Sequence, residues 1–161
     1  MRTGDDCISI NGGSSFINIT DVACGPGHGI SIGSLGKNGE YETVEEVHVK
    51  NCSFTGTQNG ARIKTWAGGS GYARKITFQN INFTAARNPV INDQNYDSSD
   101  AATDTAVNIS HITYYKMYGT SAVENAIQLD CDNSIGCTNK TFASCNNAHG
   151  TSSSSTPCLL N

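Results

Sequence analysis

The side chains of this chain that could carry out chemistry lie in four short segments. The first segment, TGDDCISI at residues 3–10, holds two adjacent carboxylates, Asp5 and Asp6. The other segments add one imidazole, two cations and one phenol: His28, Arg62, Lys64 and Tyr96. Two carboxyl groups can supply the acid and the base that break a glycosidic bond, and Arg or Lys can bind sugar carboxylates. The set therefore suits cleavage of an acidic polysaccharide.

Each of these side chains also has a simpler explanation. An isolated Asp-Asp pair is more often a solvated turn or cap than a catalytic pair, and an imidazole between two glycines fits a turn. Arg62 and Lys64 could form a solvated strand face, and Tyr96 alone is typical of a core or surface aromatic. The functional interpretation requires a fold that brings the four segments onto one strip.

A repeat in the sequence predicts such a fold. Short alternating segments rich in Ile, Val, Phe and Thr recur about every 30 residues, with equivalent positions at Ile17, Val47, Ile76 and Val107. No helical stripe is long enough for a core helix, so each repeat is expected to form one coil of a solenoid. The prediction is an all-β parallel β-helix formed by residues 1–161 as one domain. Equivalent residues of successive coils then lie about 4.8 Å apart, with Arg62 and Lys64 on one face and Ile63 inside.

Asparagines recur with the same period. Four of them are expected near one place in successive coils: Asn18, Asn51, Asn80 and Asn108. Asn at a turn, bonding the backbone or a stacked neighbour, explains them at least as well as glycosylation of the Asn-x-Ser/Thr sequons.

Composition excludes several partners. The 161 residues include 14 acidic and 10 basic side chains, a net charge of −4, and no run of Lys or Arg. Nucleic acid is therefore not expected as a partner. No apolar stretch approaches the roughly 20 residues of a membrane span, and a polar segment directly follows Met1, so neither a membrane segment nor a signal peptide is expected within these residues.

Seven cysteines without zinc-site spacing predict disulfides, and hence secretion. Proximity in sequence suggests three pairs, Cys7 with Cys24, Cys131 with Cys137, and Cys145 with Cys158. The last pair would close a Ser-rich loop near the C-terminus. Cys52 is left over and expected to be buried.

The chemical segments also resemble a known family. TGDDCISI, CGPGHGISIGSLG, NGARIKTW and DQNY are similar, in this order, to signature motifs of the plant-type polygalacturonases (pectinases) of glycoside hydrolase family 28, and the resemblance covers essentially the whole chain. It implies a right-handed parallel β-helix that hydrolyses the α-1,4-galacturonosyl bonds of pectin with inversion. The expected partner is pectin, the full-length protein is expected to be monomeric, and no metal or cofactor is expected.

The resemblance also assigns roles by position. Asp5 matches the general acid, and Asp6 matches one of the carboxylates that activate water. His28 supports the acid and substrate binding, whereas Arg62, Lys64 and Tyr96 bind substrate. Adjacent residues cannot span an inverting site, whose acid and base lie roughly 6.5–9.5 Å apart, and the family completes the base with a third Asp in an Asn-Thr-Asp motif about one coil upstream.

That motif is not among these 161 residues. The chain is therefore expected to be a C-terminal fragment that holds only the C-terminal coils, without the N-terminal half and signal peptide of a secreted, cell-wall enzyme. Two alternatives stay open. One is an exopolygalacturonase or rhamnogalacturonan hydrolase of the same architecture, and the other is a non-catalytic or degenerate pectin-binding relative. A calcium-dependent β-helix lyase is disfavoured because the two carboxylates lack a wider acidic cluster.

Overall fold

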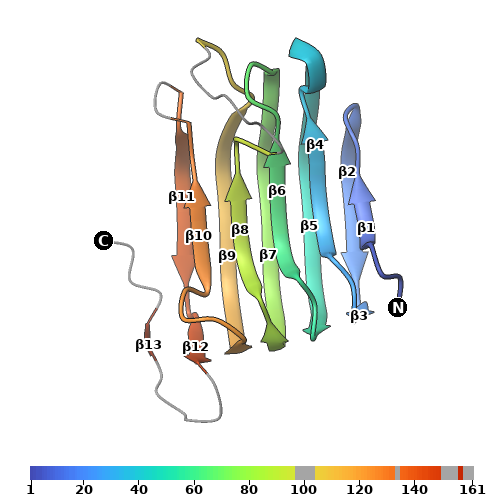
Figure 1. The fold of residues 1–161 in the computed structure, drawn as a ribbon, viewed down its shortest axis with the longest axis vertical. Coiled ribbons are helices and arrows are strands. Elements are labelled where there is room, and N and C mark those ends of the chain that lie inside the picture. Colours follow the sequence, from blue (N-terminus) through green and yellow to red (C-terminus); the bar gives the residue numbers. More distant parts are fainter. Residues whose placement is uncertain (97–103, 133–134, 150–155, 158–161) are drawn as a thin grey trace.

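Strands wound into successive coils make up most of the described part of the chain (Figure 1), and they pair in parallel except at 146–157, where the last two strands are antiparallel. The structure, a computed structural model, describes residues 1–96, 104–132, 135–149 and 156–157. Its five-stranded sheet has the order β1 (Asp6–Ile10), β4 (Gly29–Leu35), β6 (Asn59–Thr65), β8 (Asn88–Asp93) and β10 (Ile127–Asp130). The predicted right-handed parallel β-helix is confirmed.

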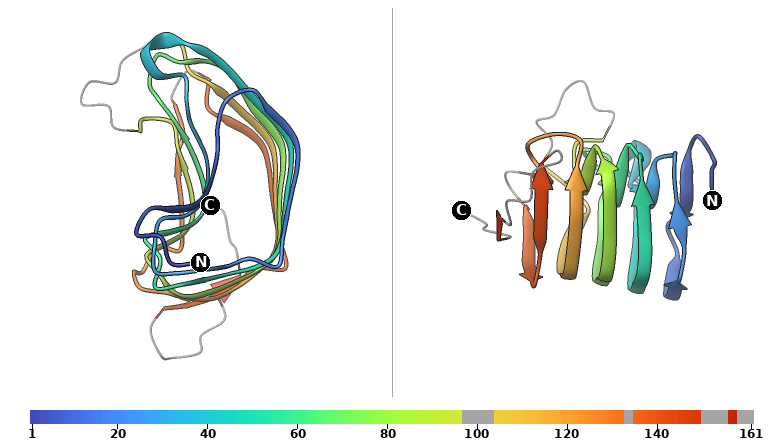
Figure 2. Two further views of the ribbon diagram at one scale, coloured as in Figure 1. Left: turned by 90° about the vertical axis from the view of Figure 1, so that its right-hand side faces the viewer. Right: turned by 90° about the horizontal axis from the view of Figure 1, so that it is seen from below.

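A second sheet of eight strands forms the remaining wall of the coils. Its main path has the order β13 (Thr156–Pro157), β12 (Asn146–His149), β9 (Asn108–Ser121), β7 (Ser70–Ala86), β5 (Tyr41–Thr55) and β2 (Ser14–Thr20). Two further strands join it, β11 (Cys137–Ala143) beside β9 and β3 (Ala23–Cys24) beside β5. Viewed along the stack, the coils superpose (Figure 2). Within the described ranges the helical structure is one short 3-10 turn, η1 (Lys37–Gly39), and no helix could span a membrane.

The register of the strands confirms the first two steps of the predicted repeat. Ile17 pairs with Val47, and Val47 pairs with Ile76. The third step is wrong, because Ile76 pairs with Ile112 rather than with Val107. The coil from Ile76 to Ile112 is therefore longer than the two before it. The added residues come between the end of β8 at Asp93 and the start of β9 at Asn108. A period read from sequence cannot separate residues of a strand from residues added to a turn.

Only two of the four asparagines, Asn51 and Asn80, stack on each other in successive coils. Asn51 and Asn80 both have left-handed backbone, with φ of 53° and 56°, a conformation that Asn tolerates better than most residues. The Asn80 Nδ2 donates a hydrogen bond of 2.7 Å to the Asn51 Oδ1. The prediction is wrong for Asn18 and Asn108, which lie within strands opposite His48 and Tyr72.

The inside of the coils is a continuous apolar core. In β6, Ile63 is fully buried, as predicted from the alternation of the strand. Aromatic rings from β7, β9 and β11 stack from coil to coil within the core. The ring centroids are 5.6 Å apart for Phe78 and Tyr114 and 4.7 Å apart for Tyr114 and Phe142. The Tyr114 hydroxyl donates a 2.8 Å hydrogen bond to the Asn92 Oδ1, so this buried phenol keeps a polar partner.

The cysteines follow the predicted pairing only in part. The Cys131–Cys137 disulfide is confirmed, and Cys52 is a buried thiol, as expected. Cys7 and Cys24 form no disulfide here. Both are buried thiols, and burial, followed by the hydrogen bond with Cys7, raises the pKa of Cys24 and so favours the protonated thiol over the reactive thiolate. The predicted partner of Cys145, Cys158, lies outside the described residues.

Candidate functional site

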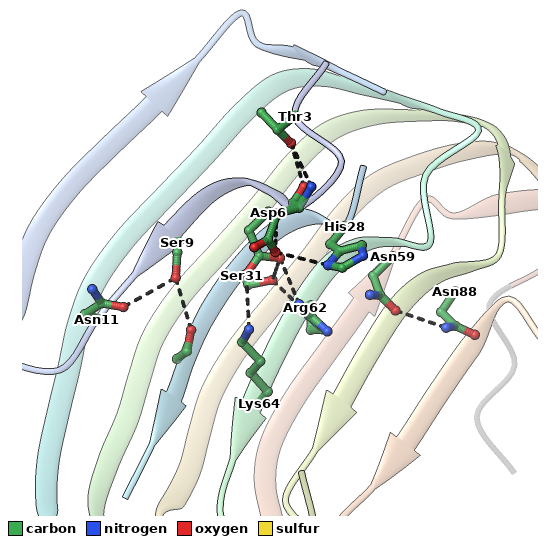
Figure 3. A network of polar contacts seen from close by, with 12 residues as sticks. Thr3, Asp6, Ser9, Asn11, His28, Ser31, Asn59, Arg62, Lys64 and Asn88 are labelled. Carbon is green, nitrogen blue, oxygen red and sulfur yellow. Dashed lines mark hydrogen bonds and ion pairs between the residues drawn. The ribbon is translucent and has the colours of Figure 1, made fainter. Parts of the chain in front are cut away.

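The predicted site lies on the outer face of the five-stranded sheet, across its first three strands (Figure 3). Asp6 begins β1 and pairs in register with Gly29 of β4, directly after His28. Arg62 lies in β6, opposite Ser31 of β4. The parallel pairing of β1 with β4 and of β4 with β6 therefore brings Asp6 and Arg62 together, although they are 56 positions apart in the chain.

Asp6 is held by three donors. The Ser31 hydroxyl donates to Asp6 Oδ1 at 2.7 Å, and Arg62 Nη2 donates to the same oxygen at 2.8 Å. Lys64 Nζ donates to Asp6 Oδ2 at 3.1 Å. Burial acts to raise the pKa of Asp6, but the hydrogen bonds from Ser31 and Lys64, together with the two positive charges, outweigh burial and lower it. Asp6 is therefore an ionised carboxylate whose position is fixed.

Asp5 has a different environment from its neighbour. Its side chain is 84% exposed, and its Oδ1 lies 3.1 Å from His28 Nδ1. The same oxygen accepts the backbone N–H of Asp6 at 2.7 Å, and the backbone N–H of His28 donates to the Asp5 carbonyl at 2.8 Å. Asp5 is thus an accessible carboxyl whose position is set by His28 and by the backbone N–H of Asp6.

Arg62 and Lys64 lie on the same outer face, as predicted, and both are largely buried, with 9% and 8% of their surface exposed. From the sequence, the expected partners of these two cations were the carboxylates of a substrate and no residue of the chain. The structure shows that Asp6 is a partner of both, so any contact with a substrate carboxylate would be made by the donor hydrogens that Asp6 and Ser31 leave unused. Five donor hydrogens on a guanidinium and three on an ammonium make such sharing possible.

Tyr96 joins the site through Lys64. The Lys64 Nζ lies 5.1 Å from the centroid of the Tyr96 ring, a cation–π distance, and the Tyr96 N–H donates to the Thr65 carbonyl at 3.0 Å. Trp66 packs edge-on against Tyr96, with ring centroids 5.6 Å apart. All six predicted site residues are therefore on one continuous strip.

Two further residues of this strip, Ser31 and Asp93, were not predicted as site residues from the sequence. Ser31 has no exposed surface and links Asp6 to Arg62; the alternation of GISIGS, with Ser31 between two buried isoleucines, was the available signal. Asp93 pairs in register with Lys64. Burial raises the pKa of Asp93 despite the hydrogen bond from the Asn95 backbone N–H, and nearby Asp130 raises it further.

A metal ion is a further possibility for the acidic end of the strip. Asp5, Asp6 and His28 offer three ligand atoms that lie within 4.8 Å of one another. Arg62 and Lys64 already neutralise Asp6, however, and their charges would repel a bound cation. The arrangement is better suited to acid–base chemistry on an anionic substrate, and the absence of a metal cofactor stays a prediction.

The fold and the site together define a class: a parallel β-helix that presents two carboxylates, an imidazole and two cations on its outer face. Comparison with known proteins identifies the family. Residues 1–159 match the model of glycosyl hydrolases family 28, and the chain belongs to that family. Over 143 residues, 86% of this chain, it is 55% identical to a probable polygalacturonase of Arabidopsis thaliana, and it is 51% identical to a polygalacturonase of Chamaecyparis obtusa.

The chain spans 31% and 27% of the lengths of these two relatives. A solved structure, the endo-xylogalacturonan hydrolase from Aspergillus tubingensis, matches 92% of this chain and 42% of its own chain, with a TM-score of 0.83 and 21% sequence identity. This similarity supports the β-helix fold.

Proposed function

We propose that this chain belongs to a polygalacturonase, a secreted cell-wall enzyme that hydrolyses the α-1,4-galacturonosyl bonds of pectin. The observation that carries the proposal is the contrast between the two adjacent carboxyls, since Asp5 is exposed beside His28 whereas Asp6 is ionised and held by two cations. A family 28 chain with this contrast has an acid and a carboxylate at one site.

The proposed roles follow from these environments. Asp5 protonates the oxygen of the leaving sugar, and His28 orients it through the 3.1 Å contact. Asp6 remains negatively charged and accepts a hydrogen bond from the attacking water. Arg62 and Lys64 hold Asp6 and attract the carboxylates of a galacturonan chain, and Tyr96 packs on Lys64 and contacts a bound sugar.

The geometry of the two carboxyls bears on the proposed inversion. Asp5 and Asp6 are adjacent in the chain, and an oxygen of one lies within 4.8 Å of an oxygen of the other, whereas an inverting pair needs room for a water between carboxyl groups roughly 6.5–9.5 Å apart. Asp6 alone is therefore not the whole base. The resemblance to plant polygalacturonases supplies a third Asp, in an Asn-Thr-Asp motif about one coil before Asp5, that would share the water with Asp6.

The test is the release of reducing ends from polygalacturonate by the full-length protein, with the configuration of the first product followed by ¹H NMR. We expect hydrolysis with the β anomer appearing first, and loss of hydrolysis without loss of oligogalacturonate binding in Asp5→Asn. Full activity of Asp5→Asn would overturn the assignment of the acid.

An exo-acting enzyme is the second candidate, because the chain is also 44% identical to a protein named exopolygalacturonase from Oenothera organensis. The size of the products from long oligogalacturonates separates the two modes, since an exo enzyme releases only the terminal unit at early times. Binding of polygalacturonate without any cleavage would instead support a non-catalytic pectin-binding protein.

A further inference from the structure

Ser31 is a fully buried hydroxyl at the centre of the site. It donates to Asp6 Oδ1 at 2.7 Å and accepts from Arg62 Nε at 2.8 Å. Arg62 Nη2 also reaches Asp6 Oδ1, at 2.8 Å, so Ser31, Arg62 and Asp6 close a ring of three hydrogen bonds (Figure 3).

This ring determines how Asp6 and Arg62 are oriented. Two of the three donors on Asp6 point at Oδ1, which leaves Oδ2 with Lys64 as its one donor among the described residues. Arg62 is fixed on one edge, by its Nε and Nη2, so its remaining N–H groups point away from Asp6. Without the Ser31 hydroxyl, Arg62 Nε would be a buried donor without its acceptor and could rotate to find another.

We propose that Ser31 is a positioning residue, which fixes the Asp6 carboxylate so that Oδ2 faces the attacking water and which fixes the free edge of Arg62 toward the substrate. The orientation of Asp6 and Arg62 stands on the structure alone, whereas its catalytic consequence rests on the proposed function. Among the described residues, the charged and titratable groups facing Asp6 are Asp5, His28, Arg62 and Lys64. None of these is replaced when Ser31 is changed, so Ser31 can be tested with all of them in place.

Ser9 provides a matched control. It is the register neighbour of Ser31 on β1, and its hydroxyl bonds Asn11 Oδ1 and the Gly33 carbonyl, both at 3.3 Å, rather than Asp6. Ser31→Ala and Ser9→Ala therefore remove the same atom from two adjacent strands, and only the first removal reaches the site.

The first experiment is independent of activity. The carboxyl group of Asp6 is titrated by ¹³C NMR in the chain of residues 1–161, its signal being assigned with Asp6→Asn. We expect the pKa of Asp6 to rise in Ser31→Ala and to stay at the wild-type value in Ser9→Ala. An unchanged pKa in Ser31→Ala would overturn the inference. Should that variant not fold, Ser31→Cys keeps a weaker donor of similar size, and the same rise is expected.

The second experiment measures kcat and KM on polygalacturonate with the full-length protein, which includes the upstream segment expected to carry the third Asp. Because hydrogen bonds to charged groups contribute about 1.5–3 kcal/mol, kcat is expected to fall on the order of 10- to 100-fold in Ser31→Ala, with the acid limb of the pH profile moved to higher pH. Ser9→Ala is expected to match the wild type. Full-length wild-type protein that cleaves nothing refutes the proposed function, whereas active full-length protein with equal kcat in Ser31→Ala and Ser9→Ala refutes the role of Ser31.

Discussion

Replacing Asp6 by Asn removes the charge that neutralises two buried cations while keeping the shape of the side chain. The side chains of Arg62 and Lys64 are 11% and 10% exposed, and that of Asp6 is 10% exposed. Removing one partner of such a buried ion pair costs about 3–5 kcal/mol, because the remaining charge stays desolvated. Asn can still accept hydrogen bonds from Ser31 and Arg62, so we expect a loss near the lower value, about 3 kcal/mol.

Urea unfolding measures this loss, and Trp66, the single tryptophan of the chain, is the fluorescent probe. With a denaturant dependence of about 2 kcal/mol per molar urea, the midpoint should fall by about 1.5 M. Glu46→Gln is the control. Glu46 pairs with Lys75 at 2.9 Å on the surface, where the Lys75 side chain is 54% exposed, so its replacement should change the midpoint far less.

The pH dependence gives a second check on the same variant. The pKa of Asp6 is lowered in the folded state, so the unfolded state binds its proton first on acidification. The stability from Asp6 is therefore fully present above its ordinary value of 3.8 and is lost as the pH falls through the folded-state pKa. The difference between wild type and Asp6→Asn should shrink in that acidic window. A midpoint shift no larger than that of Glu46→Gln, or a difference that does not change in acid, would refute the reasoning.

Three further predictions concern the core and the site. Tyr114→Phe removes the buried hydrogen bond to Asn92 and should lower the free energy of unfolding by about 1–3 kcal/mol; a change below about 0.5 kcal/mol in urea unfolding would show that the bond contributes little. Asp5→Asn should lower kcat on polygalacturonate at least about 100-fold, with binding measured by calorimetry unchanged; loss of binding as well would point to a structural role. Lys64→Ala should raise KM and also lower kcat, because Lys64 holds Asp6 Oδ2 at 3.1 Å; steady-state kinetics with kcat unchanged would limit its role to substrate binding.

Much of the site was predictable because it depends on short segments with fixed geometry. The alternation of a strand places Arg62 and Lys64 on one face and Ile63 in the core, whatever the rest of the chain does. The repeat, together with the order of the four motifs, indicated a β-helix with these segments in adjacent coils. The sequence could not show how many residues each turn would absorb, and this is why Val107 was assigned to a position that Ile112 occupies.

Other features depend on contacts between coils, which local pattern does not encode. The sequence presents Asp5 and Asp6 as an equal pair, and only the stacking of β1, β4 and β6 gives one of them a histidine and the other two cations and Ser31. The same stacking turns two expected substrate ligands into partners of Asp6. By itself the sequence therefore determined the alternation within a strand, with Arg62 and Lys64 outward and Ile63 inside. The tertiary structure decided which outward side chains form ion pairs and hydrogen bonds, because electrostatic and hydrogen-bond energies depend on distances between residues far apart in the chain.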